Sequence, residues 1–277
     1  MTSPLPMTPG RWLALAIGTP LALLAIGYTA LTAVAFAGLG SYRVNLATPV
    51  AGRAAAVNVN TGDLTVGPGP AGQLRVHGTL RYSLVRPQLS WRRSASTITI
   101  HSGCRVPAGL CLLDYRVTVP AGSRPAVSDG SGDLTASGMA GTFTLNDGSG
   151  NITATGISGA PTISDASGDI VVTSLSGSRA VLMDDAGDIS VSGVSSRRLT
   201  VSDQLGDISV VFTKVPDRVQ VTNSSGDITL VFPPGPATYR VSASTSSGSV
   251  TTSVPRSLTS THLVSVTDQS GNISISQ

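Results

Sequence analysis

The sequence predicts an all-β chain whose C-terminal part is a parallel β-solenoid of about eight coils of 18–23 residues, preceded by a single transmembrane α-helix. A Gly-Asp-Ile-like motif recurs eight times between Ala126 and Gln277, and its glycines stand 18, 18, 19, 19, 20, 22 and 23 residues apart. Copies of this length are too short to bury an apolar face alone, so they stack on one another. Apolar and polar residues alternate within each copy, as they do in strands with one buried face. An uncharged run over residues 12–42 predicts the helix.

The composition also favours strands and divides the chain by charge. The acids are 15 Asp and no Glu, and the bases are 17 Arg and one Lys, Lys214. Glu and Lys favour helices, so their scarcity indicates a chain rich in strands and turns. Residues 1–125 carry 11 Arg against Asp63 and Asp114, a net charge of +9, whereas residues 126–277 carry six Arg and Lys214 against 13 Asp, a net charge of −6. We expect the two parts to meet different surroundings.

The uncharged run over residues 12–42 is longer than the roughly 20 residues that a helix needs to cross a bilayer. Arg11 and Trp12 stand at one end and Tyr42 and Arg43 at the other, as interfacial anchors do. We therefore expect residues 12–42 to contact the lipid bilayer and the protein to be a single-pass protein of the cell membrane. The alternative is a secretory signal cleaved after Ala37. Both interpretations send the C-terminal part out of the cytoplasm.

The only two cysteines, Cys104 and Cys111, lie in a loop between two strand-like segments. The ends of such a loop lie side by side, so a disulfide is geometrically feasible and would stabilise the fold by about 2–3 kcal/mol. Disulfides persist outside the cytoplasm, which favours a C-terminal domain on the outer side. We expect three regions: residues 1–43, a cytoplasmic stub and transmembrane helix (or uncleaved signal anchor); residues 44–125, a tether and irregular β-rich N-terminal cap with the disulfide loop; and residues 126–277, the β-solenoid.

The core is predicted from columns that appear when the copies are aligned on the motif glycine. Those columns are aliphatic in nearly every copy, so stacking turns each into a buried ladder. The column five residues before glycine consists of Val127, Leu145, Ile163, Leu182, Val201, Val221, Ala243 and Val266. The column two residues after glycine consists of Leu134, Ile152, Ile170, Ile189, Ile208, Ile228, Val250 and Ile273. The column four residues after glycine consists of Ala136, Ala154, Val172, Val191, Val210, Leu230, Thr252 and Ile275.

Two acidic columns flank the motif glycine. Three before it stand Asp129, Asp147, Asp165, Asp184, Asp203, Asn223, Thr245 and Asp268, and one after it stand Asp133, Asn151, Asp169, Asp188, Asp207, Asp227, Ser249 and Asn272. Asn, Thr and Ser retain an acceptor oxygen, so these exceptions favour Asx-turn bonds to the corner N–H groups. A calcium ladder is the alternative, although the calcium-binding nonapeptide is absent. We predict no metal site and no cofactor.

An enzymatic interpretation has little support in the sequence. Paired Asp residues can act as acid and base in polysaccharide cleavage, but here they recur in every copy without a singular cluster. The histidines His77, His101 and His262 are scattered, and Lys214, Asp217 and Arg218 form the only faint cluster outside the columns. Trp91-Arg92-Arg93 is a basic-aromatic cluster, which fits lipid phosphates, anionic polymers or a solvated loop. We predict that the protein is not an enzyme.

The segment Tyr115-Arg116-Val117-Thr118-Val119-Pro120-Ala121-Gly122, followed by eight motifs in register, resembles the bacterial putative-adhesin family of β-strand-repeat domains of unknown function. The resemblance covers most of residues 50–277 and implies an envelope-facing β-solenoid, often membrane-tethered, with no catalytic residues to transfer. We expect a non-catalytic binding, adhesion or envelope-scaffold module whose partner is a cell-envelope polymer or a membrane protein and not a nucleic acid. The alternatives are an accessory or sensor subunit of a membrane complex and, more remotely, a polysaccharide-active β-helix enzyme.

Overall fold

The computed structural model describes residues 18–29, 39–50, 54–83, 86–94, 96–103 and 111–277. Residues 18–29 form a helix, and strands dominate the remainder, so the predicted all-β class is confirmed. Within the described ranges, no helix has the length and apolar character needed to span a membrane. The transmembrane prediction also rests on residues 12–17 and 30–38, which lie outside the described residues.

The strands of the described residues form a 22-stranded sheet. Its strands are β1 (Leu39–Pro49), β2 (Ala54–Val59), β3 (Asp63–Gly69), β4 (Gln73–Ser83), β5 (Gln88–Ser94), β6 (Thr97–Gly103), β7 (Cys111–Pro120), β8 (Arg124–Asp129), β9 (Leu134–Ser137), β10 (Ala140–Asn146), β11 (Ile152–Ser164), β12 (Ile170–Gly177), β13 (Ala180–Met183), β14 (Ile189–Ser196), β15 (Arg198–Ser202), β16 (Ile208–Phe212), β17 (Arg218–Ser225), β18 (Ile228–Val231), β19 (Arg240–Ser247), β20 (Val250–Thr252), β21 (Leu263–Ser270) and β22 (Ile273–Ser276).

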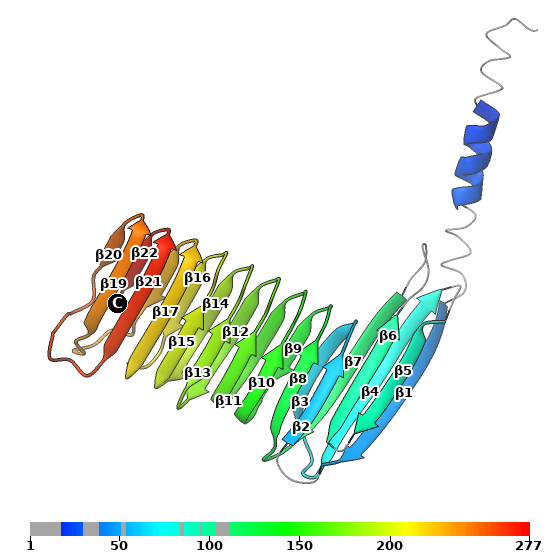
Figure 1. The fold of residues 1–277 in the computed structure, drawn as a ribbon, viewed down its shortest axis with the longest axis horizontal. Helices are drawn as coiled ribbons and strands as arrows, with labels where there is room; N and C mark the ends of the chain where they lie inside the picture. Colours follow the sequence, from blue (N-terminus) through cyan, green and yellow to red (C-terminus); the bar gives the residue numbers. More distant parts are fainter. Residues whose placement is uncertain (1–17, 30–38, 51–53, 84–85, 95, 104–110) are drawn as a thin grey trace, which may run out of the picture. The chain divides into compact units, whose positions relative to one another are not determined.

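The chain divides into two compact units. One comprises Met1–Tyr42, Leu80–Gln88 and Cys104–Leu112, and the other comprises Arg43–Thr79, Leu89–Gly103 and Leu113–Gln277. All of the repeats belong to the second unit, in which successive coils lie side by side (Figure 1). The candidate sites described below all lie in this second unit.

Each repeat is one coil, with a strand before the glycine corner and a strand after it. Equivalent strands of neighbouring coils pair in parallel and in register: Ile152 in β11 lies opposite Ile170 in β12, and Ile170 lies opposite Ile189 in β14. The columns predicted from the sequence are therefore ladders in the structure. Their members are buried, with the exception of the coil around Gly248, where Val250 is 42% exposed.

The order of the coils departs from the order of the sequence at both ends of the stack. The last strands of the chain, β21 and β22, pair on one side with β17 and β18 and on the other with β19 and β20. Near the start, β2 lies between β6 and β8, and β3 lies between β7 and β9. The coil of residues 240–252 is consequently the outermost one at its end of the stack, although it is not the last in sequence.

Polarity explains why the last two coils are exchanged. The inward positions of the final coil, among them Val264, Val266 and Ile275, are apolar and at most 2% exposed, because coils cover them on both sides. The coil of residues 240–252 has Val241, Ala243 and Thr252 opposite these three, and all are half-exposed, so two of the three places carry a smaller or more polar side chain than in the final coil. A polar outermost repeat is the usual termination of a solenoid, because its outer face meets water.

Glycine is required at each corner because neighbouring coils approach closely there. Gly168 has a φ of 140° and donates its N–H to the carbonyl of Ala186 at 2.9 Å. A Cβ added to Gly168 would overlap the carbonyl oxygen of Gly150 in the preceding coil. The corner thus excludes side chains by both backbone conformation and contact.

We expect Gly168→Ala to lower the free energy of unfolding by several kcal/mol, because the coils must separate to admit the methyl group. Gly156→Ala is the matched control. Gly156 also has a positive φ, of 65°, but its Cβ would meet only the Gly138 nitrogen at 3.9 Å. Chemical denaturation of both variants measures the difference, and equal losses would show that conformation alone, without the inter-coil contact, requires glycine.

Candidate functional site

The inner acidic column, three residues before each glycine, is buried under the corners. Its members are at most 6% exposed in seven coils: Asp129, Asp147, Asp165, Asp184, Asp203, Asn223 and Asp268. One carboxylate oxygen is used locally, since Asp147 Oδ1 accepts from the N–H of Gly148 at 2.7 Å and Asp203 Oδ1 accepts from Gln204 at 2.7 Å. In Asp165, Oδ1 also accepts the N–H of Ser167, two residues on, at 3.3 Å, which agrees with the Asx-turn interpretation of the column.

The second carboxylate oxygen of this column has no such partner. In the described structure, Oδ2 is buried without a hydrogen bond in Asp129, Asp147, Asp165, Asp184 and Asp203. The two natural replacements place a donor here: Asn223 Nδ2 donates to the Gly206 carbonyl at 2.9 Å, and Thr245 Oγ1 donates to the Gly271 carbonyl at 3.1 Å. A carboxyl group can make the same bond only when it carries a proton.

Burial also disfavours the charged form of these carboxyl groups. It raises the pKa of Asp129 and Asp184 to about 7, and that of Asp147 and Asp203 to about 6. Neighbouring carboxylates raise the pKa further, whereas the main-chain N–H donors lower it. Asp165 shifts in the same direction, again mainly through burial. The geometry and the pKa direction therefore agree that the protonated form is favoured in Asp129, Asp147, Asp165, Asp184 and Asp203.

We expect the stability of the protein to fall as the pH rises from about 4 to about 7. The folded-state pKa of Asp147 is raised above its usual value of 3.8, so the folded state binds the proton more tightly and loses this advantage as the pH passes through about 6. Asp147→Asn supplies a permanent donor and should raise the free energy of unfolding at pH 8 by about 1–3 kcal/mol.

The reciprocal control is Asn223→Asp, which should destabilise the protein at pH 8 more than at pH 5. Denaturation of the wild type and both variants at the two pH values measures these effects. Equal stability of Asp147→Asn and wild type at pH 8 would mean that the unpaired oxygen is satisfied without a proton.

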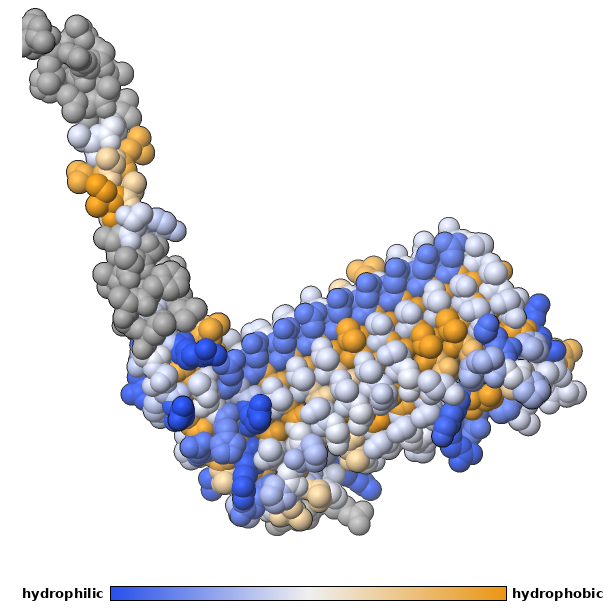
Figure 2. Space-filling view, turned by 180° about the vertical axis from the view of Figure 1, so that it is seen from behind, coloured by the Kyte–Doolittle hydropathy of each residue, from blue (hydrophilic) through white to orange (hydrophobic). Residues whose placement is uncertain are grey.

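The outer acidic column, one residue after glycine, forms an exposed ladder between coils. Asp169 Oδ1 accepts the main-chain N–H of Asp188 at 2.9 Å, and Asp188 Oδ1 accepts that of Asp207 at 2.8 Å. On the face drawn in Figure 2, hydrophilic residues form a continuous row across successive coils, as such a ladder produces. Within the described residues, no group of three or more His, Cys, Asp or Glu side chains is placed to hold a metal ion.

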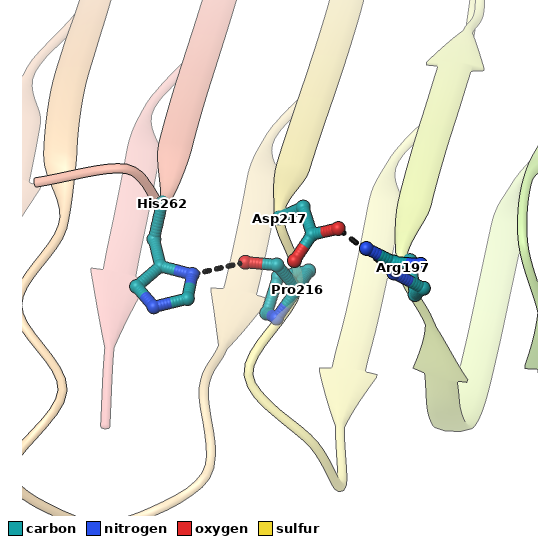
Figure 3. A network of polar contacts seen from close by, with 4 residues as sticks. All are labelled: Arg197, Pro216, Asp217 and His262. Carbon is teal, nitrogen blue, oxygen red and sulfur yellow. Dashed lines mark hydrogen bonds and ion pairs between the residues drawn. The ribbon is translucent and has the colours of Figure 1, made fainter.

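At the other end of the strands, the return turns carry a second polar network (Figure 3). Arg197 Nε and Asp217 Oδ2 form an ion pair at 2.9 Å, with side chains that are 74% and 43% exposed. His262 Nδ1 donates to the Pro216 carbonyl at 2.9 Å, which ties the turn before β21 to the turn before β17. Lys214, Asp217 and Arg218 form the faint cluster noted in the sequence. The structure pairs Asp217 with Arg197, and the side chain of Lys214 is exposed.

A row of three arginines lies beside this network. Arg198 and Arg218 are register partners in β15 and β17, and Arg179 directly precedes Ala180, the partner of Leu199. The three side chains are exposed and line a surface hollow of about 570 Å³, together with Thr200, Gln220 and Asp217. Sequence analysis did not identify this arginine row, although all three residues stand eight positions before a motif glycine.

The basic-aromatic cluster noted in the sequence lines a second, smaller hollow of about 360 Å³. Ser90, Trp91 and Arg92 of β5 form it with Thr99 and His101 of β6. The guanidinium of Arg93 lies 5.8 Å from the centre of the Trp91 ring, within the range of a cation–π contact. This hollow offers one histidine and no carboxylate among its lining residues.

The remaining sequence candidates stay apart in the structure. His77 contacts Asn45 through Nδ1 at 2.6 Å, far along the chain from His101 and His262, so the histidines form no cluster in the described structure. Cys111 begins β7, and none of the described cysteines is a free thiol. Cys104 lies outside the described residues, so the disulfide between Cys104 and Cys111 stays a prediction.

These features define an all-β repeat protein with polar surface sites on a stack of coils. A family model described as Toastrack DUF4097 matches residues 115–276. The chain belongs to this family, which agrees with the putative-adhesin resemblance noted in the sequence.

Solved structures with the same fold share little sequence with this chain. A putative lipid binding protein from Parabacteroides distasonis is 13% identical with a TM-score of 0.57, covering 85% of this chain and 96% of its own. A putative adhesin from Bacteroides fragilis is 12% identical with a TM-score of 0.54, covering 84% and 96%. A putative adhesin from Parabacteroides distasonis is 11% identical with a TM-score of 0.53, covering 86% and 97%. No curated protein matches this chain.

Proposed function

We propose that the protein is a membrane-anchored, extracytoplasmic β-solenoid that acts as a non-catalytic binding, adhesion or envelope-scaffold module. The observation that carries this proposal is the arginine-lined hollow of about 570 Å³ on the side of the coil stack. It combines three cationic side chains with hydroxyl and amide groups but only one carboxylate, Asp217, which is paired with Arg197. Such a surface can bind a charged partner, but it lacks a nucleophile with an adjacent base.

Two further observations support a role at the cell surface. The parallel, in-register coils form a stack whose side chains repeat along its length, which suits binding to an extended partner. The solved structures with this fold include proteins named putative adhesins and one named a putative lipid binding protein, and both names describe binding. The uncharged run over residues 12–42 is the proposed anchor.

The proposed binding function can be tested with an array of cell-envelope polymers and glycans. We expect the full chain, purified in detergent micelles, to bind at least one envelope polymer saturably. Failure to bind any polymer, together with stoichiometric co-purification of a membrane protein, would instead assign the chain as an accessory or sensor subunit.

The proposed topology makes a separate prediction for the two cysteines. In intact cells, Cys104 and Cys111 should resist a membrane-impermeant thiol reagent until a reductant is added, because a disulfide forms outside the cytoplasm. Cys111→Ser removes the bond and should make Cys104 reactive without reductant. Labelling of both thiols only after cell lysis would place the repeats in the cytoplasm and contradict the proposal.

A further inference from the structure

The arginine row is a consequence of the coil register. Arg198 and Arg218 lie opposite each other on paired parallel strands, and Arg179 occupies the corresponding position of the preceding coil. Strands in a sheet are about 4.8 Å apart, so three guanidinium groups start from neighbouring positions on one face. Such a row of like charges is unfavourable unless an anion lies against it.

The described protein itself does not supply that anion. Asp217 is the one carboxylate that lines the hollow, and its Oδ2 already accepts from Arg197 Nε at 2.9 Å. Within the described residues, Arg179, Arg198 and Arg218 have no ion pair. The acidic columns lie at the opposite end of the five-residue strand β15, which is about 17 Å away at 3.3 Å per residue. The hollow therefore carries an uncompensated positive charge.

The chemistry of the lining points to phosphate groups. Guanidinium groups bind phosphate through two parallel N–H···O bonds, which a row of arginines can repeat along an extended ligand. Thr200 and Gln220 add neutral donors to the lining of the hollow. The lining contains no aromatic side chain on which a base could stack, which disfavours a nucleic acid.

We propose that the arginine row of Arg179, Arg198 and Arg218 binds a soluble linear polymer that carries repeated phosphate groups. This inference rests on the proposed binding function and names the chemical class of its ligand. A polymer is favoured over a single phosphate because three consecutive coils repeat the same cationic position, and each can take one group of a chain.

The test is calorimetric titration of the full chain, in neutral detergent micelles, with inorganic polyphosphate. We expect saturable binding that weakens as salt is added, since the contacts are ionic. R198Q/R218Q should raise Kd by roughly 100-fold, at about tenfold for each lost guanidinium contact. R124Q is the matched control, because Arg124 is exposed at the start of β8 but lies opposite Ala54, so it belongs to no row. It should leave Kd within about twofold of wild type.

Melting temperatures of all variants should equal that of the wild type, because the substituted side chains are exposed. Equal losses of affinity in R124Q and R198Q/R218Q would overturn the proposal, since the polyanion would then respond to positive charge anywhere on the surface and not to the arginine row. Loss of polyphosphate binding when an anionic phospholipid is added to the micelles would also overturn it, because a lipid headgroup would be the occupant. An envelope polymer that binds R198Q/R218Q as tightly as wild type would refute this inference while leaving the proposed binding function intact.

Discussion

The close approach of backbones at the glycine corners is the constraint on which the rest of the structure depends. The corner of each coil meets the carbonyl of the preceding corner where no side chain fits, as at Gly168 and Gly150. Because each glycine must lie against the glycine of the neighbouring coil, this contact does not allow the coils to shift by even one residue relative to each other. With the register fixed, the residue three before glycine is buried, the residue one after it joins an exposed ladder, and the residue eight before it lies at the return turn.

Charged side chains have different partners at the two ends of the strands. At the glycine corners, carboxylates are stacked, but main-chain N–H groups bind them and burial favours their protonated form, as for Asp147. At the return turns beside the arginine row, the one side-chain carboxylate is that of Asp217, and it forms an ion pair with Arg197. At the return turns, the exposed side chains of Arg179, Arg198 and Arg218 have no ion pair within the described residues. This contrast arises from which residues the register aligns, although residues 126–277 are acidic as a whole.

Periodicity made the strands, the buried columns and the corner acceptors predictable, because every coil repeats the same local requirement. Ile170, for example, is fully buried as its column predicts. The coil order was not predictable by that means, since it depends on a comparison between coils: Thr252 tolerates the outermost position better than Ile275 does. The arginine row has a sequence signal, because Arg124, Arg179, Arg198, Arg218 and Arg240 all stand eight residues before a motif glycine. The coil order decides how many of them become neighbours, since Leu263 lies between Arg218 and Arg240.

The exchanged coils at the two ends of the stack have a consequence for how the chain reaches its native state. A solenoid stacked in sequence order can grow from one end as it is synthesised or exported. Here the coil of residues 240–252 has no place to dock until β21 and β22, at the C-terminus, have joined β17 and β18. Likewise, β2 requires β6 and β8, which are made later. The strands β21 and β22 thus link the outermost coil to the rest of the stack, so the coil of residues 240–252 completes its pairing only after these later strands have formed.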